Sequence, residues 1–466
     1  MESAASASAH DALSFALRGH AGPVVLDMRG VHHPLTSRGG RAFTPYEDVI
    51  HLTLSKRALW IGSRRDVAVL PRKAFVRPEA PEALARALLE KLAARPNSRA
   101  QLARMAEIEE RARACPPSYA TWALTILCVA VYALQLLLGH DVYIVGHMSP
   151  PLVADGDAWR LVTANLLHDD QMLPFHVHLL MNLAGLVAFG TLCERPLGTA
   201  RTLAVMGVSG LAAMTACAFS PLPVVGVSGV VFGLVGAVTW LEHFRTDELP
   251  AWWRVPRRPL YVMLTLSFLL GAVVPFIAGA AHMAGFAAGA LTAALLADRP
   301  LDARSAPASV RALAALVVFA TAAGIGVAGA QLFGPGDFGA RHLARIAELP
   351  GISPQELNNQ AWFVAIDEES TPEQLAVALS LAERAVDETD RRDATILDTL
   401  AELQFLTGEP EAAVATIEEA IALDPQEPYY TEQRRRFLGE RSDRPDPLNP
   451  YRRPPEPAAG EGEITA

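Results

Sequence analysis

The sequence has few charged residues and few cysteines. Charged residues make up 19% of the 466 positions, whereas a soluble globular domain has about 25%. Four cysteines, mostly inside or beside apolar runs, are too few for a disulfide scaffold and are expected to behave as small core side chains. No excess of Lys and Arg is present either: the net charge is −10, which argues against a nucleic-acid-binding protein.

Apolar residues are concentrated between residues 118 and 334. They form runs of about 18–22 residues with almost no charge, and a helix needs about 20 such residues to cross a bilayer. This pattern excludes an all-soluble enzyme and predicts seven membrane spans. The expected spans are Tyr119–Gly139, Phe175–Cys193, Thr202–Ser220, Val227–Leu241, Leu260–Ile277, Ala280–Ala297 and Ala312–Phe333.

Arginine residues indicate the orientation of these spans. They lie before span one and in the loops after spans two, four and six, whereas the loops after spans three and five contain no Lys or Arg. Cytoplasmic loops of membrane proteins are enriched in these residues. The pattern predicts a multi-pass protein of the inner (cytoplasmic) membrane, with the N-terminus in the cytoplasm and the C-terminal domain on the outer side.

The segments that flank the spans have different patterns. Residues 1–22, which are small and polar, and the tail 441–466, rich in Pro, Arg and Glu, are expected to be disordered. Residues 23–95 alternate short β-like runs with turns, close with a helix and resemble a small pleckstrin-homology-like domain. A charged linker helix is expected over 96–117. Residues 340–440 resemble tetratricopeptide repeats, a scaffold that binds proteins and peptides, so a protein partner is expected.

The predicted fold class is therefore an α-helical polytopic membrane protein embedded in a lipid bilayer. A core of six transmembrane helices is expected over 118–298, with a seventh helix over 309–334. A small β-rich domain precedes this core, and an all-α domain follows it.

Polar side chains inside membrane spans are costly, so each is a candidate functional residue. Ser228, in a Gly-Val-Ser-Gly run, lies near the outer end of span four, and His282 lies near the outer end of span six. His178 and Asn182 are four residues apart in the outer part of span two and share one helix face. Three spans thus place a hydroxyl, an imidazole and a His/Asn pair at one depth on one side.

These side chains suit acyl transfer. A serine hydroxyl is a weak nucleophile until a base takes its proton, and a neutral imidazole can do so near pH 7. His178, Asn182 and the Ser228 backbone N–H can donate to a developing oxyanion. Since no membrane carboxylate is placed to orient His282, a two-residue dyad is favoured over a triad, with no metal or other cofactor.

The motifs from about Tyr119 to Ala297 resemble, in order, those of rhomboid intramembrane serine proteases. The matching residues are Trp159-Arg160; His168, His178 and Asn182; Glu194 and Gly198; Gly226, Ser228, Gly229 and Gly233; and Ala281, His282, Gly285 and Gly289. The resemblance implies that Ser228 is the nucleophile, that His282 is the base, and that transmembrane proteins are substrates. It implies that His178 and Asn182 donate to the oxyanion. Phe232 matches an aromatic position that packs against the base.

Simpler interpretations compete for several of these residues. Ser209, in a second Gly-Val-Ser-Gly run, is expected only to pack helices. Nine residues separate His168 from His178, where compact rhomboids have four, so His168 can anchor a loop or take part in chemistry. A metal site at His168, His176 and His178 is disfavoured, because the sequence has no HExxH motif and no carboxylate nearby on the same helix. Glu194 and Arg160 are interpreted as structural anchors.

Two further functions stay open beside an active protease. A catalytically silent rhomboid-like protein could hold membrane clients, although such relatives typically lose the serine or the histidine, and both are present here. A small-molecule transporter would line a path through the bilayer with polar residues, whereas here these residues cluster at one end.

Overall fold

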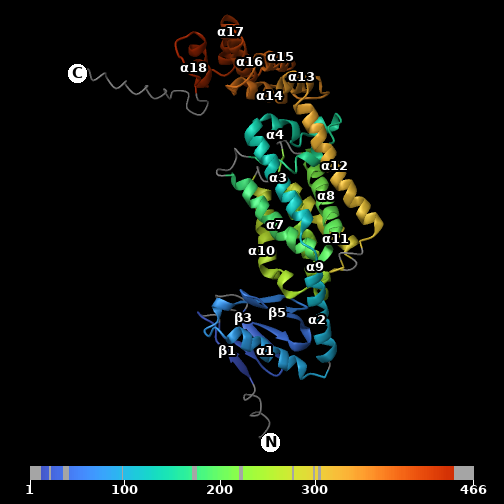
Figure 1. Ribbon diagram of the computed structural model, residues 1–466. Helices are drawn as coiled ribbons and strands as arrows, with labels where there is room; N and C mark the ends of the chain where they lie inside the picture. Colours follow the sequence, from blue (N-terminus) through green and yellow to red (C-terminus); the bar gives the residue numbers. More distant parts are fainter. Residues whose placement is uncertain are drawn as a thin grey trace, which may run out of the picture. The chain divides into compact units, whose positions relative to one another are not determined.

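The computed structural model describes residues 12–19, 22–34, 41–96, 98–169, 176–219, 224–274, 278–297, 300–302 and 306–445. By their contacts these residues fall into two compact units. The first comprises the described residues up to 153 together with 158–328, and the second comprises 154–157 and those from 329 onward. Figure 1 shows the elements of both units coloured along the chain.

A small β-rich domain begins the first unit. Its strands are β1 (Leu13–Phe15), β2 (Val24–Leu26), β3 (Gly30–Pro34) and β4 (Arg41–Pro45) in one antiparallel sheet, and β5 (Val49–Leu54), β6 (Ala58–Ser63) and β7 (Val67–Pro71) in another. Alternate strand residues such as Val24, Leu26 and Leu59 are fully buried and share a core with Leu84 and Leu88 of helix α1 (Ala80–Ala93). The β-rich character is confirmed, and the pleckstrin-homology resemblance stays a prediction.

The sequence predicts disorder for residues 1–22 and 441–466, but a short stretch of each has defined structure. Leu13–Phe15 form strand β1, which pairs with β2 and places Phe15 against the domain core. Arg441 forms an ion pair with Asp443 at 2.7 Å, and Arg444 forms one with Glu402 at 2.7 Å. Pairing with strand β2 and with Glu402 stabilises these stretches, which have little apolar pattern of their own. Residues 1–11, 20–21 and 446–466 lie outside the described residues.

The rest of the first unit is helical. Its long helices are α2 (Ser98–Ala114), α3 (Tyr119–Leu138), α7 (Val177–Leu197), α8 (Thr199–Ala216), α9 (Ser228–Phe244), α10 (Arg257–Val273), α11 (Gly279–Leu296) and most of α12 (Ala308–Leu332). The short helices α4 (Asp141–Gly146), α5 (Pro150–Ala154) and α6 (Arg160–Thr163) lie between α3 and α7 in the chain.

Four of these helices, α3, α7, α11 and α12, are long and apolar enough to cross a membrane. Large apolar side chains on them, such as Ile126, Leu137 and Leu295, are more than half exposed, which is expected of a surface that faces lipid. A multi-pass membrane protein is therefore confirmed. Each of the seven expected spans contains a helix, but α9 is a shorter apolar helix of 17 residues, and the count of seven crossings stays a prediction.

Helices α9 and α11 run parallel to each other, and their backbones are in direct contact. A methyl group on Gly285 would lie 2.2 Å from the Gly229 carbonyl oxygen, and one on Gly289 would lie 2.0 Å from that of Gly233. Only glycine permits such close approach, which van der Waals packing between membrane helices favours. Because the two helices run in parallel, residues in their first turns lie side by side.

The second unit is all-helical. Its helices are α13 (Phe338–Glu348), α14 (Pro354–Ile366), α15 (Pro372–Glu388), α16 (Ala394–Leu406), α17 (Pro410–Leu423) and α18 (Pro428–Phe437). Helix α14 packs with α15 and α16 with α17, with Ala361, Ala382, Ala401 and Ala420 fully buried. The small side chains let these helices approach closely. The assignment to tetratricopeptide repeats stays a prediction.

Candidate active site

Ser228 and His282 meet at the start of two neighbouring helices. Ser228 is the first residue of α9, and His282 lies in the first turn of α11. The distance from His282 Nε2 to Ser228 Oγ is 2.9 Å, although the two residues are 54 positions apart. This is ordinary hydrogen-bond geometry, in which the hydroxyl donates to the imidazole nitrogen. The parallel contact of α9 and α11 brings the pair together.

An aromatic side chain orients the imidazole. The ring of Phe232, one turn after Ser228, stacks on that of His282 with centroids 4.3 Å apart and an interplanar angle of 16°. Phe268 of α10 packs against Phe232 at 5.9 Å. The second ring nitrogen, His282 Nδ1, is buried and has no hydrogen-bond partner among the described residues. In a catalytic triad a carboxylate bound to Nδ1 would orient the histidine. Here stacking on Phe232 orients the His282 ring instead.

Gly226 connects the candidate oxyanion donors to the start of α9. Its φ of +122° is a conformation that L side chains rarely adopt, and its N–H donates to the Ala164 carbonyl at 2.8 Å. A methyl group at this position would lie 3.0 Å from His178 Nε2 and 3.7 Å from Asn182 Nδ2. Thus His178 and Asn182 both lie against the backbone two residues before Ser228.

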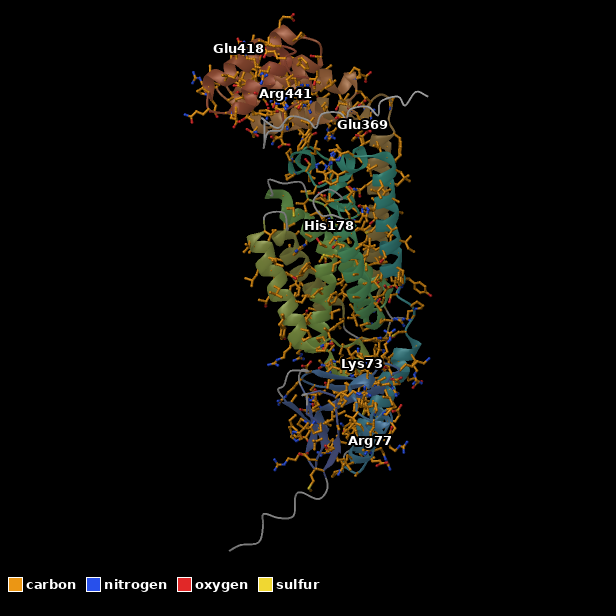
Figure 2. The ribbon with its side chains drawn as sticks, turned by 90° about the vertical axis from the view of Figure 1, so that its left-hand side faces the viewer. Lys73, Arg77, His178, Glu369, Glu418 and Arg441 are labelled. Atoms are coloured by element: carbon orange, nitrogen blue, oxygen red, sulfur yellow. The ribbon has the colours of Figure 1, made fainter. Side chains whose placement is uncertain are left out.

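His178 lies among the helices of the first unit (Figure 2). Its Nδ1 accepts a hydrogen bond from the Asp169 N–H at 3.3 Å. In the neutral ring the other nitrogen then carries the hydrogen, so Nε2 is a donor on the Gly226 side. Asn182, one turn further along α7, is 7% exposed and adds an amide on the same face.

His168 is fully buried next to His178. Their rings contact edge to face with centroids 5.3 Å apart. The side chain of Gln135 in α3 holds the His168 backbone at both ends, donating to its carbonyl at 2.9 Å and accepting from its N–H at 3.1 Å. Sequence reasoning missed Gln135, although a polar residue in an apolar span is the signal that would have found it.

The remaining histidine of the group lies apart from this contact. His176 precedes α7 with a φ of +57°, and its Nδ1 lies 2.5 Å from the Tyr132 hydroxyl. Among the described residues, no group of three or more His, Cys, Asp or Glu side chains could hold a metal ion. The segment 170–175 between His168 and His176 lies outside the described residues.

Two charged residues anchor the surrounding structure. The buried Arg160 donates to the carbonyls of Ile144 at 2.8 Å and His147 at 3.1 Å. The buried Glu194 carboxylate accepts from the backbone N–H groups of Ala120 and Thr121, both at 2.9 Å, at the start of α3. Both side chains satisfy backbone groups that would otherwise be unpaired.

Ser209, in the second Gly-Val-Ser-Gly run, packs against Gly233. A methyl group on Gly233 would lie 2.0 Å from Ser209 Oγ. The hydroxyl is buried and makes no hydrogen bond with a described residue. The two runs share their four residue types, but the structure brings a histidine to the hydroxyl of Ser228 and a glycine to that of Ser209.

Comparison with known proteins agrees with the motifs. The family model for the rhomboid domain matches residues 155–299. The chain is 32% identical over 142 residues to the putative rhomboid protease YdcA of Bacillus subtilis, which covers 30% of this chain and 67% of that protein. It is 30% identical over 146 residues to the rhomboid protease GluP of Bacillus subtilis, covering 31% of this chain and 27% of GluP.

A third relative is the rhomboid protease GlpG of Klebsiella pneumoniae. It is 30% identical over 176 residues, which cover 36% of this chain and 60% of that protein. The chain thus spans less than two thirds of the length of GluP and of GlpG. All three matches involve about a third of this chain.

Proposed function

The chain belongs to the rhomboid family of intramembrane serine proteases, and we propose that it cleaves transmembrane segments of other membrane proteins with a Ser228–His282 dyad. The observation that carries this proposal is the 2.9 Å contact between Ser228 Oγ and His282 Nε2. Both residues lie in the first turns of their helices, so a peptide carbonyl can approach them from the end of the bundle rather than through its middle.

The reaction follows from these positions. His282 Nε2 takes the proton of Ser228 as Oγ attacks the peptide carbonyl carbon. The protonated imidazole then gives this proton to the leaving amine, which leaves an acyl group on Ser228. A water molecule, deprotonated by His282, hydrolyses the ester and returns the proton to Ser228. Stacking on Phe232 keeps the ring in place through both steps.

Three groups stabilise the oxyanion in this proposal. His178 Nε2–H and the Asn182 amide lie beside Gly226, and the Ser228 N–H is a donor of the first helical turn with no intrahelical partner. Donors fixed before the reaction stabilise the transition state, and one of them typically contributes about 10²–10³ in rate. His168, packed on His178, keeps this donor in position.

The orientation in the bilayer is part of the same proposal. With seven crossings, the Arg-rich loops and the β-rich domain lie in the cytoplasm of an inner-membrane protein, while the dyad and the α13–α18 helices face the outer side. We propose that α13–α18 act as tetratricopeptide-like repeats that bind a protein partner or substrate. Protease protection of the repeats in sealed membrane vesicles of known orientation tests this arrangement.

The dyad is tested with a fluorophosphonate probe and a model membrane substrate. We expect Ser228→Ala to abolish both labelling and cleavage, because the nucleophile is lost. Ser209→Ala is the matched control, since it removes a hydroxyl from the same Gly-Val-Ser-Gly sequence, and it should keep most of the activity. Equal loss in the two variants would contradict the assignment. Folded wild-type protein that binds the substrate but neither labels nor cleaves would indicate the silent binding function.

A further inference from the structure

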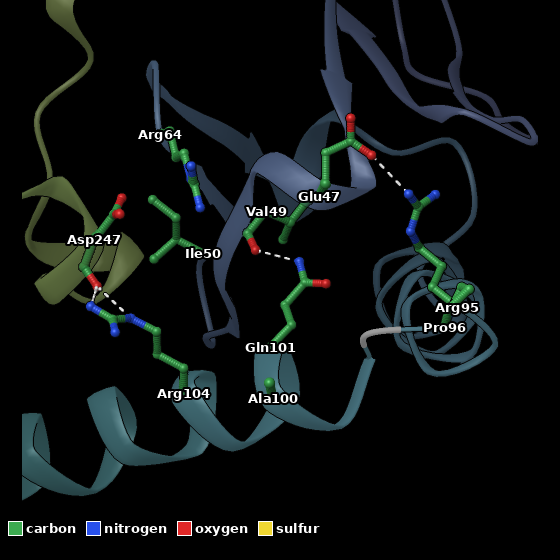
Figure 3. A pocket seen from close by; sticks show the side chains of 10 residues that line it. All are labelled: Glu47, Val49, Ile50, Arg64, Arg95, Pro96, Ala100, Gln101, Arg104 and Asp247. Carbon is green, nitrogen blue, oxygen red and sulfur yellow. Dashed lines mark hydrogen bonds and ion pairs between the residues drawn. The ribbon is translucent and has the colours of Figure 1, made fainter.

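A cavity of about 550 Å³ lies far from the dyad, where the β-rich domain, α2 and the connection between α9 and α10 meet (Figure 3). Asp247 of this connection lines it, three residues after α9 ends at Phe244. Because Ser228 begins α9, the dyad and the cavity lie at opposite ends of this helix, which is roughly 25 Å long at about 1.5 Å per residue. The cavity therefore lies near the membrane surface opposite the dyad.

Three guanidinium groups from separate elements line the cavity. Arg64 comes from the turn between β6 and β7, Arg95 from the segment that follows α1, and Arg104 from α2. Arg95 is paired with Glu47 at 2.7 Å. Arg104 donates to the backbone carbonyl of Asp247 at 3.3 Å, and its guanidinium forms no ion pair with a described residue.

The balance of charge leaves this cavity positive. Arg64 forms no side-chain hydrogen bond or ion pair with a described residue. Glu47 is neutralised by Arg95, and Figure 3 shows the Asp247 carboxylate directed away from the Arg104 guanidinium. Two guanidinium groups, those of Arg64 and Arg104, thus face the cavity without a carboxylate bound to them. Phosphate oxygens are the acceptors that guanidinium groups bind best, often two at a time.

A buried contact joins the β-rich domain to the α9–α10 connection, and Ser63 of this contact is the chain neighbour of Arg64. Arg254 of the connection is paired with Glu242 of α9 at 3.1 Å, and both side chains are almost fully buried. Arg254 also donates to the Ser63 carbonyl at the end of β6. The N–H of Arg257, the first residue of α10, donates to Asp66 Oδ1 at 3.2 Å. A ligand that binds both Arg64 and Arg104 would add a further link between the β-rich domain and α2, next to this contact.

We propose that the cavity binds a phosphate-bearing anion through Arg64 and Arg104, and that binding tightens the β-rich domain on the α9–α10 connection. The headgroup of an acidic phospholipid is one source, since headgroups lie at the depth where α9 ends, and a soluble phosphate is the other. Binding is independent of the proposed protease chemistry. An effect on cleavage rests on the proposed function, because α9 begins at Ser228 and α10 carries the Phe268 that packs on Phe232.

The test uses full-length Ser228→Ala protein, so that binding is measured without turnover. Lipid retention is measured by native mass spectrometry after reconstitution in phosphatidylcholine with or without phosphatidylglycerol, and thermal unfolding is measured with inorganic phosphate. We expect retention of phosphatidylglycerol over phosphatidylcholine, and a loss of roughly tenfold in the double variant Arg64→Ala, Arg104→Ala. Stabilisation by inorganic phosphate without lipid selectivity would support the site and identify a soluble ligand.

The matched control is Arg65→Ala, Arg99→Ala. It removes two exposed arginines from the same turn and the same helix, neither of which lines the cavity. Equal loss in the two double variants would overturn the proposal, because it would indicate attraction of anions to the basic surface in general. So would the absence of any response to phosphatidylglycerol and to phosphate. The single variant Arg64→Ala should also bind the anion more weakly than the parent protein. Because the Arg64 side chain makes no bond with a described residue, its removal breaks no such bond, and this loss would not reflect misfolding.

A second measurement separates this proposal from the protease function. Wild-type cleavage is compared in vesicles with and without phosphatidylglycerol, using the same double variants. Selective binding in the Ser228→Ala protein supports the site even where the wild type does not cleave. A wild type that cleaves but whose Ser228→Ala form does not bind either anion overturns the site and leaves the protease function standing.

Discussion

At the scale of single residues, Gly226 determines how the candidate oxyanion donors meet the nucleophile. Its positive φ turns the chain so that Ser228 can begin α9, and its missing side chain lets His178 and Asn182 lie against the backbone. Ala164 fixes the turn by accepting the Gly226 N–H. Glycine is therefore required at position 226 both for its positive φ and for the close approach of the two side chains.

Gly226→Ala should therefore reduce both activity and stability. The methyl group would meet His178 Nε2 at 3.0 Å and the backbone would be strained, a cost of about 1–3 kcal/mol. Displacement of two oxyanion donors should lower kcat by about 10² or more. Cleavage rate and thermal unfolding measure the two effects. Gly326→Ala is the control, because nothing lies within 4 Å of a methyl group at Gly326 in α12, and a near-normal Gly226→Ala enzyme would contradict the geometry.

At the scale of elements, a buried histidine joins the β-rich domain to the connection between α9 and α10. His51 in β5 is 2% exposed; its Nδ1 accepts from the Ala251 N–H at 3.2 Å, and its Nε2 lies 3.2 Å from the Glu109 carboxylate in α2. These partners suit a neutral ring that accepts at Nδ1 and donates at Nε2. Burial lowers the pKa of His51 to about 4.

This contact should weaken in acid. The folded-state pKa of His51 lies below its ordinary value of about 6.5, so its contribution is complete above pH 6.5 and is lost as the pH falls towards 4. Protonation of Nδ1 removes the acceptor for the Ala251 N–H, at a cost of up to about 3 kcal/mol. Thermal unfolding of wild type and His51→Gln between pH 7.5 and 4.5 measures this.

Glutamine is chosen because it accepts and donates hydrogen bonds but does not titrate in this range. We expect the wild type to lose stability faster than His51→Gln as the pH falls. Parallel pH curves for the two proteins would show that other groups, and not His51, account for the acid sensitivity of this contact.

At the scale of the whole molecule, the chain combines a family core with two domains outside the matched region. The family match ends at residue 299, and α13–α18 begin at Phe338 with a core of their own. A domain that folds around its own core and is tethered to an enzyme raises the local concentration of what it binds. The proposed role of the repeats is therefore recruitment of large substrates.

Deleting residues 340–466 should separate recruitment from chemistry. We expect unchanged cleavage of a minimal transmembrane peptide and slower cleavage of full-length membrane substrates, by several-fold or more. The comparison of kcat/KM for the two substrates measures this, with fluorophosphonate labelling to show that the truncated enzyme has an intact dyad. Equal slowing on both substrates would indicate that the repeats stabilise the core instead of recruiting.

The membrane class and the family follow from local features of the sequence, whereas the catalytic roles of single residues stay predictions. Length and apolarity of a span are local properties, and a polar side chain in such a span is conspicuous without any structure. Ser228, His282, His178 and Asn182 therefore stand out as candidates one span at a time, and the family that shares their order is confirmed by the comparisons. Gln135 carried the same signal and was overlooked.

How these residues meet depends on tertiary packing, because the contacts between them join distant parts of the chain. The 2.9 Å approach of Ser228 to His282 spans 54 positions and depends on the glycine contacts between α9 and α11. The three-residue strand β1 is too short to give a periodic pattern and is stable only through its pairing with β2. The bond from Arg254 to the Ser63 carbonyl spans 191 positions, and no local pattern encodes it. Residue chemistry is encoded locally, whereas proximity results from the packing of the whole chain.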